Sequence, residues 1–386
     1  MTSFSVLSPA KLEYGPGSVN NIPGIVAELK SEASPLALVL SDKGVSGTGL
    51  PARIASAVEK AGTSCLLVDS VPPEPTDGDL DGIATILRQK KVGIIIAIGG
   101  GSVMDASKIL SVLTTNTLKT ANLAEQGVKA RGIPYIAVPT TAGTGAEATP
   151  NAIIMFPDRN LKIGIVSPHF IPDRVLLDPE LTLGLPRGLT ASTGMDALCH
   201  LLECHIGKKA NPYSNLFARE GMGLVAANLR EACNNGSNLE ARSAMMLAAY
   251  YGGVCIASSG TNAVHALSYP LGGTFRIPHG IANAALLVPV LASLAERIPQ
   301  SLGAISRIMG FSSSSKDEEA TETLIAGLHT LVADLGIPRT LDGLGVPASA
   351  IPELTEAAYS VRRLLDNNPV GLSKEDIRGI YKSMTI

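Results

Sequence analysis

The sequence lacks tryptophan altogether, and aromatic residues make up only 4% of its 386 positions. Few rings are therefore present that could stack on nucleobases or sugars. Charged residues account for 17% of the chain, the net charge is −3, and Lys and Arg form no basic run. A protein of this composition offers no field that attracts nucleic acid or an anionic membrane surface. We expect neither nucleic acid nor a membrane among its partners.

The chain also lacks a long apolar segment and a cysteine framework. Its longest weakly polar stretches, residues 244–257 and 281–294, are shorter than the ~20 residues that cross a membrane. The N-terminal segment shows no basic residues followed by an apolar core, so we expect no signal peptide. An odd number of cysteines without a CxxC pair predicts reduced thiols in a cytoplasmic protein: Cys65, Cys199, Cys204, Cys233 and Cys255.

Two different patterns divide the chain, whose length alone suggests more than one domain. In the first half, apolar runs alternate with helical stretches, which predicts a parallel sheet covered by helices on both faces. From about residue 189 the chain is rich in Ala, Leu, Met and Glu, which predicts helices. We therefore predict an α/β domain at residues 1–185 and an all-helical domain at residues 186–386. The predicted strands are 36–40, 65–68, 92–98 and 135–138, and the predicted helices are 50–61, 79–89, 103–112, 190–205, 213–233, 239–258, 281–297, 319–335 and 373–384.

Three of the six histidines gather with one aspartate in two segments of the second half. Asp196 and His200 are four residues apart in TASTGMDALCHLLE, so a helix places both on one face. His265 and His279 come from NAVHALSYPLGGTFRIPHG, whose glycines and prolines can turn the chain back on itself. A lone histidine is more often a packed core residue, but one carboxylate and three imidazoles together suit Fe(II), Zn(II), Mn(II) or Ni(II). Such a site keeps a position open for substrate.

Polar loops follow three of the predicted strands. Gly99-Gly100-Gly101-Ser102 stands between an apolar strand and a helix, an arrangement in which backbone N–H groups can bind phosphate. Asp42 ends an earlier strand, where a carboxylate can bind ribose hydroxyls and repel a 2′-phosphate, although a helix cap is the alternative. The loop at residues 137–151 adds hydroxyl donors at Thr140, Thr141 and Thr144. These loops predict a nucleotide site that prefers NAD to NADP.

In combination these motifs resemble the iron-containing (group III) alcohol dehydrogenases, which share the fold of dehydroquinate synthase. The resemblance extends from LEYGPGS at residues 12–18 to NNP at residues 367–369. Its segments, in order, are SDKGV at 41–45, GGGSVMDASK at 99–108, PTTAGTGAE at 139–147, DPELT at 178–182, TGMDALCHLLE at 193–203 and HALSYPLGGTFRIPHGIAN at 265–283.

The resemblance implies an NAD-binding α/β domain, a helical metal-binding domain and a role for each candidate residue. One divalent metal, typically Fe(II) with Zn(II) as the alternative, is bound by Asp196, His200, His265 and His279. Asp42 contacts the adenosine ribose, and Asn151 and Ile153 lie near the nicotinamide. The pyrophosphate loop is Gly99, Gly100, Gly101 and Ser102, with further cofactor contacts from Thr140, Thr141, Thr144 and Lys162.

The implied activity is that of an NAD-dependent alcohol dehydrogenase or aldehyde reductase. The metal polarises the substrate oxygen, hydride passes directly to or from the nicotinamide, and no catalytic side chain beyond the metal ligands is needed. A small aliphatic alcohol or aldehyde fits a pocket that includes Ile153 and Ile256. Arg362 and Arg363 could receive an anionic group of the substrate, although adjacent arginines are more often solvated or paired.

The sequence departs from the family pattern at several positions. Tyr269 stands where many members have a further histidine, which puts the route of the proton in doubt. Ala146 replaces a serine, and Val370 replaces an arginine after NNP. His205 takes a position that is commonly aromatic, and we interpret it as a neighbour of the metal helix and not as a ligand.

Two other enzyme classes and one binding function compete with the dehydrogenase. A hydroxyacid–oxoacid transhydrogenase would hold its NAD permanently, and a lyase of the dehydroquinate-synthase type would use a different set of metal ligands. A nucleotide-binding scaffold without activity would predict a broken ligand set, whereas all four residues are present. Family members are usually homo-oligomers, so we expect a dimer or a larger assembly, and a small molecule as the other partner.

Overall fold

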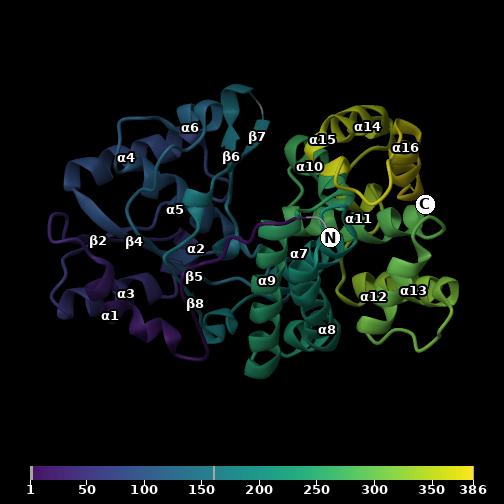
Figure 1. Ribbon diagram of the computed structural model, residues 1–386, viewed down its shortest axis with the longest axis horizontal. Coiled ribbons are helices and arrows are strands. Elements are labelled where there is room, and N and C mark those ends of the chain that lie inside the picture. The colour runs from purple at the N-terminus through teal and green to yellow at the C-terminus, as the bar shows by residue number, and fades with distance from the viewer. Residues whose placement is uncertain (1–2, 160, 386) are drawn as a thin grey trace. The chain divides into compact units, whose positions relative to one another are not determined.

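The computed structural model describes residues 3–159 and 161–385, which form two compact units (Figure 1). The α/β unit comprises Leu7–Thr141 and Gly145–Thr182. The helical unit comprises the chain from Leu183 onward, together with Ala142–Thr144 and the N-terminal segment that ends at Val6. The boundary between residues 185 and 186 stays a prediction about how the chain divides into separately folding domains.

A six-stranded parallel sheet forms the centre of the α/β unit. Its strand order is β1-β8-β5-β4-β2-β3, and every neighbouring pair is parallel. The three strands β5, β4 and β2 are apolar and almost wholly buried, as expected where helices cover both faces of a sheet. The strand bounds are β1 Leu12–Tyr14, β2 Leu36–Leu40, β3 Cys65–Val68, β4 Val92–Gly99, β5 Tyr135–Pro139 and β8 Arg174–Leu177.

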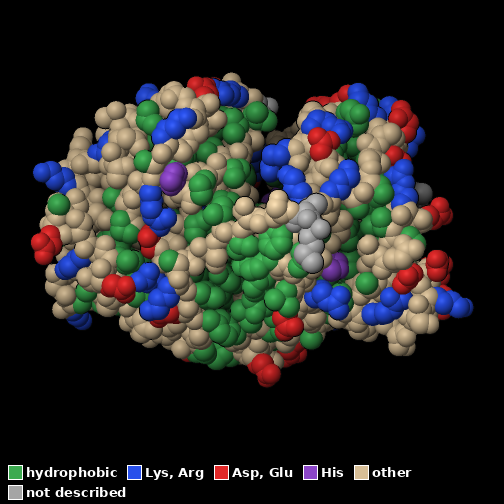
Figure 2. Space-filling view, in the orientation of Figure 1, with side chains coloured by type: hydrophobic (Ala, Val, Ile, Leu, Met, Phe, Trp, Pro, Cys, Tyr) green, Lys and Arg blue, Asp and Glu red, His purple; other side chains and the backbone are tan. Residues whose placement is uncertain are grey.

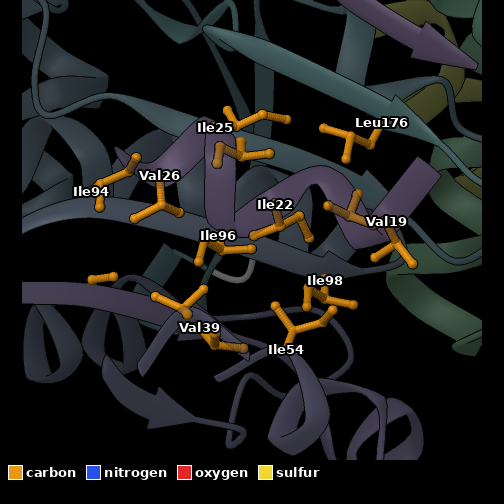
Figure 3. Close-up of a cluster of buried hydrophobic side chains, with 14 residues drawn as sticks. Val19, Ile22, Ile25, Val26, Val39, Ile54, Ile94, Ile96, Ile98 and Leu176 are labelled. Carbon is orange, nitrogen blue, oxygen red and sulfur yellow. The ribbon is translucent and has the colours of Figure 1, made fainter. Parts of the chain in front are cut away.

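Helices cover this sheet on its two faces (Figure 1). The alternating residues Ile94, Ile96 and Ile98 of β4 contact Ile22 and Ile54, which belong to helices on one face (Figure 3). Burial of each such side chain stabilises the fold by roughly 1.5–3 kcal/mol. The helices on this face are α1 Ile22–Leu29 and α3 Leu50–Lys60, and those on the other are α4 Asp77–Lys90 and α5 Gly101–Leu113. Two short helices, α2 Lys43–Ser46 and α6 Thr120–Gln126, complete the unit.

An antiparallel hairpin stands apart from the parallel sheet. It consists of β6 (Asn151–Phe156) and β7 (Leu161–Val166), with Asn151 opposite Val166. A single bridge between Thr76 and Met155 connects it to the start of α4. The hairpin is therefore a separate two-stranded sheet within the α/β unit.

Helices make up the rest of the chain. Within the helical unit α7, α8 and α9 pack on one another, and α10 and α11 pack on each other and on α7. Among the described residues no helix combines the length and the apolar character that crossing a membrane requires. The bounds are α7 Arg187–Ile206, α8 Pro212–Asn234, α9 Leu239–Ser259, α10 Ala263–Phe275, α11 His279–Leu294, α12 Pro299–Ile308, α13 Asp317–Asp334, α14 Ile351–Ser360, α15 Arg362–Leu365 and α16 Lys374–Ser383.

Charges of both signs are spread over one face of each unit (Figure 2). On the face that Figure 2 shows, basic and acidic side chains alternate with apolar and neutral ones, and no basic stripe extends across either unit. This distribution agrees with the small net charge of −3.

The structure confirms the predicted fold class and most of the predicted elements. The four predicted strands correspond to β2, β3, β4 and β5, and each of the nine predicted helices has a counterpart. The prediction missed β1, β8 and the hairpin. It also treated residues 265–279 as a turning segment, whereas His265 lies in α10 and the chain turns only at residues 276–278.

Candidate active site

Helix α7 supplies Asp196 and His200 from its buried middle. The helix is buried on nearly all sides, so both residues point into protein: Asp196 is 2% exposed and His200 is 4% exposed. A carboxylate so deep in the interior requires compensation by hydrogen bonds or by positive charge. The predicted i, i+4 relation is therefore confirmed, and it brings two donor atoms to one place.

The chain between α10 and α11 brings the other two histidines to α7. Asn262 caps α10 by accepting a hydrogen bond from the backbone of Ala263, and His265 follows in the first turn. After α10 ends, Arg276 adopts a left-handed conformation with φ 56°, and α11 begins at His279. Gly280 permits the close approach, because a Cβ there would lie 2.4 Å from the carbonyl oxygen of Ser192 in α7.

Four donor atoms converge in this part of the helical unit. The Nε2 atoms of His200, His265 and His279 lie 3.7, 3.9 and 3.7 Å from Oδ1 of Asp196. All four donor atoms lie within 4.8 Å of one another. An ion bonded tetrahedrally at about 2.1 Å holds its ligand atoms roughly 3.4 Å apart, so the cluster needs only a slight contraction to fit one. Three of the side chains are buried and that of His279 is 43% exposed, which leaves its side of the cluster open.

The hydrogen bonds of Asn283 show that the cluster attracts positive charge. Its Nδ2 lies 2.7 Å from Oδ1 of Asp196, 3.2 Å from Nε2 of His265 and 3.1 Å from Nε2 of His279. An amide group has only two N–H donors for these three acceptors, while the buried Oδ1 of Asn283 has no partner in the described chain. The donor set and its surplus of acceptors therefore fit a divalent cation.

Burial and neighbouring charge set the protonation of the cluster. Burial lowers the pKa of His200 to about 4, although Asp196 opposes the effect. Burial raises the pKa of Asp196, but the three histidines and Asn283 outweigh it and lower the pKa overall. At neutral pH His200 is thus a neutral imidazole and Asp196 an anion, which are the forms that bind a metal.

Glu203 holds His265 in place and was missed by the sequence analysis. Its Oε1 accepts hydrogen bonds from the backbone N–H groups of Asn262 at 3.1 Å and Val264 at 2.7 Å. Its Oε2 is bonded to Nδ1 of His265. When Nδ1 carries the proton, Nε2 keeps its lone pair for a metal, and it faces Asp196. Glu203 follows Asp196 by seven residues, or two helical turns, so both lie on one face of α7. This spacing could have indicated from the sequence that Glu203 lies near the cluster.

The glycine loop lies at the carboxyl end of the parallel sheet. β4 ends at Gly99 and α5 begins at Gly101, with Gly100 as an N-cap that offers no side chain to the N–H groups, and Ser102 follows. A Cβ on Gly99 would lie 2.4 Å from Cγ2 of Val103, so strand and helix approach too closely for any other residue. Free N–H groups at the start of a buried helix form an anion site.

The loops after β2 and β5 meet this glycine loop. The backbone N–H of Thr140 donates to the carbonyl of Gly99, and Thr141 lies 3.4 Å from the position of a Cβ on Gly100. Asp42 follows β2, and its Oδ1 caps the short α2 through the N–H of Val45. The cap alternative for Asp42 is therefore realised, and ribose binding stays a prediction. The structure brings all three strand-end loops to one edge of the sheet.

Thr144 and Lys162 lie elsewhere than Thr140 and Thr141. Thr144 belongs to the short segment Ala142–Thr144 that groups with the helical unit, where Gly143 contacts Thr193 of α7. Lys162 lies on β7 and forms an ion pair with Glu74 at 2.5 Å. The predicted cofactor contacts are thus distributed over the glycine loop, the hairpin and the segment that contains Thr144.

A buried lysine attaches the hairpin to the glycine-loop helix, and the sequence analysis did not identify it. Nζ of Lys108 lies 3.0 Å from Asp105, 3.0 Å from Thr149 and 2.5 Å from the backbone oxygen of Asn151. Asp105 also accepts a hydrogen bond from the N–H of Ile153 at 3.0 Å. All three donors of the ammonium group are satisfied, which allows complete burial of Lys108. This network positions Asn151 and Ile153, the two residues predicted to lie near the nicotinamide.

The candidate substrate residues also have different surroundings. Ile153 is 37% exposed on the hairpin, and Ile256 is half-buried on α9. Arg362 is bonded to Asp366 and lies over the ring of Tyr359 at 5.0 Å. Arg363 is exposed, and its guanidinium lies near the side chain of Tyr269.

The residues that depart from the family pattern can now be placed. The ring of Tyr269 lies 6.3 Å from the ring of His279, so the tyrosine borders the cluster. His205 is bonded to Asn215 at 3.0 Å and is not among the four clustered donors, as the sequence analysis expected. Ala146 lies in a short 3-10 turn, and the backbone oxygen of Val370 accepts a hydrogen bond from Asn368.

Comparisons with known proteins indicate one protein family over nearly the whole chain. A model of the iron-containing alcohol dehydrogenases matches residues 9–179, and a model of the C-terminal part of the same family matches residues 190–385. Long-chain-alcohol dehydrogenase 1 of Geobacillus thermodenitrificans (strain NG80-2) is 33% identical over 99% of this chain and 97% of its own.

Two solved structures extend the comparison to the fold. A crystal structure of 1,3-propanediol oxidoreductase has a TM-score of 0.95 at 31% identity and covers 99% of this chain and 100% of its own. Sulfoacetaldehyde reductase from Bifidobacterium kashiwanohense, solved in complex with NAD+, has a TM-score of 0.89 at 27% identity over 100% and 99% of the two chains. The fold and the matches define an oxidoreductase that acts on CH–OH groups. Within that class, the chain belongs to the iron-containing alcohol dehydrogenase family.

Proposed function

We propose that this protein is an NAD-dependent and divalent-metal-dependent alcohol dehydrogenase or aldehyde reductase that acts on small aliphatic substrates. The cluster of Asp196, His200, His265 and His279 carries the proposal, because four convergent donors with one open side suit a metal that also binds substrate. When bound, the metal supplies a Lewis acid for the substrate oxygen, and NAD exchanges hydride with the substrate carbon.

The residues of the helical unit would hold the metal ion and orient its ligands. Asp196 and the three histidines would bind the ion, and Glu203 keeps Nε2 of His265 directed toward it. The half-exposed His279 marks the side from which substrate approaches. Tyr269, which borders this side, takes the place of the family histidine and can donate a hydrogen bond there.

Iron(II) is our first candidate for the metal, and zinc(II) is the second. The donor set contains oxygen and nitrogen only, and both ions accept it. The Irving–Williams order places zinc above ferrous ion at a given site, so metal supply decides which is loaded.

The residues of the α/β unit would bind NAD. The free N–H groups of Gly101 and Ser102 suit the pyrophosphate, and the hydroxyls of Thr140 and Thr141 add donors at the same sheet edge. The carboxylate of Asp42 favours an unphosphorylated ribose over the 2′-phosphate of NADP. Thr144, Asn151 and Lys162 stay further candidates for cofactor contacts.

We also propose a cytoplasmic homodimer or a larger homo-oligomer. All five cysteines are free thiols, which suits a reducing compartment. Analytical ultracentrifugation at micromolar concentration tests the assembly, and a monomer there would contradict it.

The activity can be tested with metal-stripped protein that is reloaded anaerobically with Fe(II) or Zn(II). NADH oxidation is followed with a panel of small aldehydes, and we expect turnover that requires the metal. No oxidation with either metal and any aldehyde would contradict the dehydrogenase proposal. NAD that copurifies and exchanges hydride between two substrates without release would instead indicate a transhydrogenase.

A further inference from the structure

Two adjacent arginines in α15 have different surroundings. Arg362 is neutralised by Asp366 and stacks on Tyr359. Arg363 is exposed, and no described carboxylate lies within ion-pair distance of its guanidinium. Other arginines of the chain are held by an acid, as Arg362 is, or by backbone carbonyls, as Arg88 is. Arg363 therefore has a charge that the protein itself does not use.

Arg363 lies on the Tyr269 side of the metal cluster. Its guanidinium lies near the side chain of Tyr269, because α15 packs on α10; burial raises the pKa of Tyr269, and the arginine lowers it in part. Tyr269 follows His265 by one helical turn, and its ring lies 6.3 Å from that of His279. Burial and the charge of Arg363 both lower the pKa of His265, but Glu203 and Asp196 outweigh them and raise it overall. One tyrosine ring thus separates the guanidinium from the open side of the cluster.

The charge balance around the cluster favours an anion at Arg363. When a divalent ion is bound, the carboxylates of Asp196 and Glu203 would balance its two charges, and the neutral imidazoles would add none. Arg363 then stays as an unbalanced positive charge beside the open side at His279. A guanidinium presents N–H groups in a planar fork that matches the oxygens of a carboxylate, sulfonate or phosphonate.

We propose that Arg363 binds an oxyanion carried by the substrate, so that the preferred aldehyde or alcohol is a small molecule with a carboxylate, sulfonate or phosphonate group. This inference rests on the proposed function and names its substrate class. Arg363 determines specificity, and Tyr269 positions the guanidinium.

The test compares matched aldehydes and matched arginine variants of the metal-loaded enzyme. Propanal is the neutral substrate, and 3-oxopropanoate, sulfoacetaldehyde and phosphonoacetaldehyde are the anionic ones. We expect the unmodified enzyme to prefer at least one anionic aldehyde. Arg363→Gln should lower kcat/KM for that aldehyde about 10- to 100-fold, mainly through KM, because a charge-assisted hydrogen bond is lost. Propanal should change less than about threefold, since a neutral chain does not use the guanidinium.

Two controls separate recognition from structure. Arg362→Gln removes the neighbouring charge and should leave the preference intact, and Arg363→Lys should restore part of it because it keeps the charge. Raised salt should weaken turnover of the anionic aldehyde more than that of propanal, because Arg363 is exposed to screening. This salt test uses the unmodified enzyme and needs no variant to fold.

The outcomes are distinguishable. Equal loss for propanal and the anionic aldehydes in Arg363→Gln would overturn the inference, and so would an unmodified enzyme that prefers propanal. Turnover of propanal without any anionic preference overturns this inference alone. Absence of NADH oxidation with every aldehyde overturns the proposed function, and this inference with it.

Discussion

The two units build their candidate sites from different parts of the chain. In the α/β unit the binding groups are mostly backbone N–H groups and short side chains at the ends of adjacent strands. In the helical unit they are long side chains from three helices, and Asn283 reaches Asp196 across 87 positions of sequence. Strand order alone places the first site, whereas the second depends on the packing of α7, α10 and α11. A backbone site is therefore damaged by added volume, and a side-chain site by lost donors.

The largest effect is expected at the metal cluster. His265→Ala removes one of the four donors, so most bound metal and all measurable turnover should be lost. Binding of NAD should stay measurable, because its candidate residues are mainly in the α/β unit. Metal analysis measures the bound metal, NADH oxidation measures turnover, and calorimetric titration with NAD+ measures cofactor binding. Activity that survives the substitution would contradict the four-donor site.

A smaller effect is expected at Glu203, which forms a hydrogen bond with the candidate ligand His265. Glu203→Gln keeps an acceptor for the backbone N–H groups but weakens the bond that orients His265. We expect a loss of metal affinity of about 10- to 100-fold, as is usual for such supporting carboxylates. Competition dialysis against a chelator measures it, with the exposed Glu220→Gln of α8 as the control. Equal affinity in the two variants would show that Glu203 does not support the site.

In the α/β unit, added volume should break the site while the metal stays bound. Gly99→Ala places a methyl group 2.4 Å from Val103, which should cost about 1–3 kcal/mol of stability and weaken NAD binding. Gly82→Ala on α4 is the matched control, because nothing lies within 4 Å of its Cβ. Thermal unfolding and NAD titration compare the pair. Unchanged NAD affinity in Gly99→Ala would separate the glycine loop from the cofactor.

The smallest effect concerns the choice between NAD and NADP. Asp42→Gly should relax the preference for NAD by about tenfold, because the carboxylate that repels a 2′-phosphate is gone. Asp42 also caps α2, so Asp42→Ser provides a variant that keeps a capping oxygen and loses only the charge. The ratio of kcat/KM for NADH and NADPH reports the result. An unchanged ratio in both variants would place discrimination at another residue.

Local patterns in the sequence predicted the fold class and much of the site. The apolar runs of β2, β4 and β5 and the glycines after β4 are local signals, since sheet topology then brings their ends together. Asp196 and His200 were predicted for a similar reason, because helix periodicity relates them directly. Their partners His265 and His279 were included through residue type and the family resemblance, and not through a pattern that places them in space.

Tertiary contacts account for what the sequence did not predict. Glu203 reaches His265 across 62 positions, and Lys108 reaches Asn151 across 43. No local period relates such pairs, and a lysine in GGGSVMDASK gives no sign that it will be completely buried. Of the two arginines of α15, Arg362 has Asp366 four residues later on the same helix face, whereas the approach of Arg363 to Tyr269 depends on the packing of α15 on α10.

X-ray absorption spectroscopy of the Fe(II)-loaded protein tests the central claim most directly. Cys199 and Cys204 lie on α7 next to His200 and Glu203, and both are buried thiols whose pKa is raised by burial. The account predicts only nitrogen and oxygen around the iron, at about 2.0–2.2 Å, with the signature of imidazole rings. A sulfur atom at about 2.3 Å, or the absence of imidazole, would contradict the Asp196–histidine site.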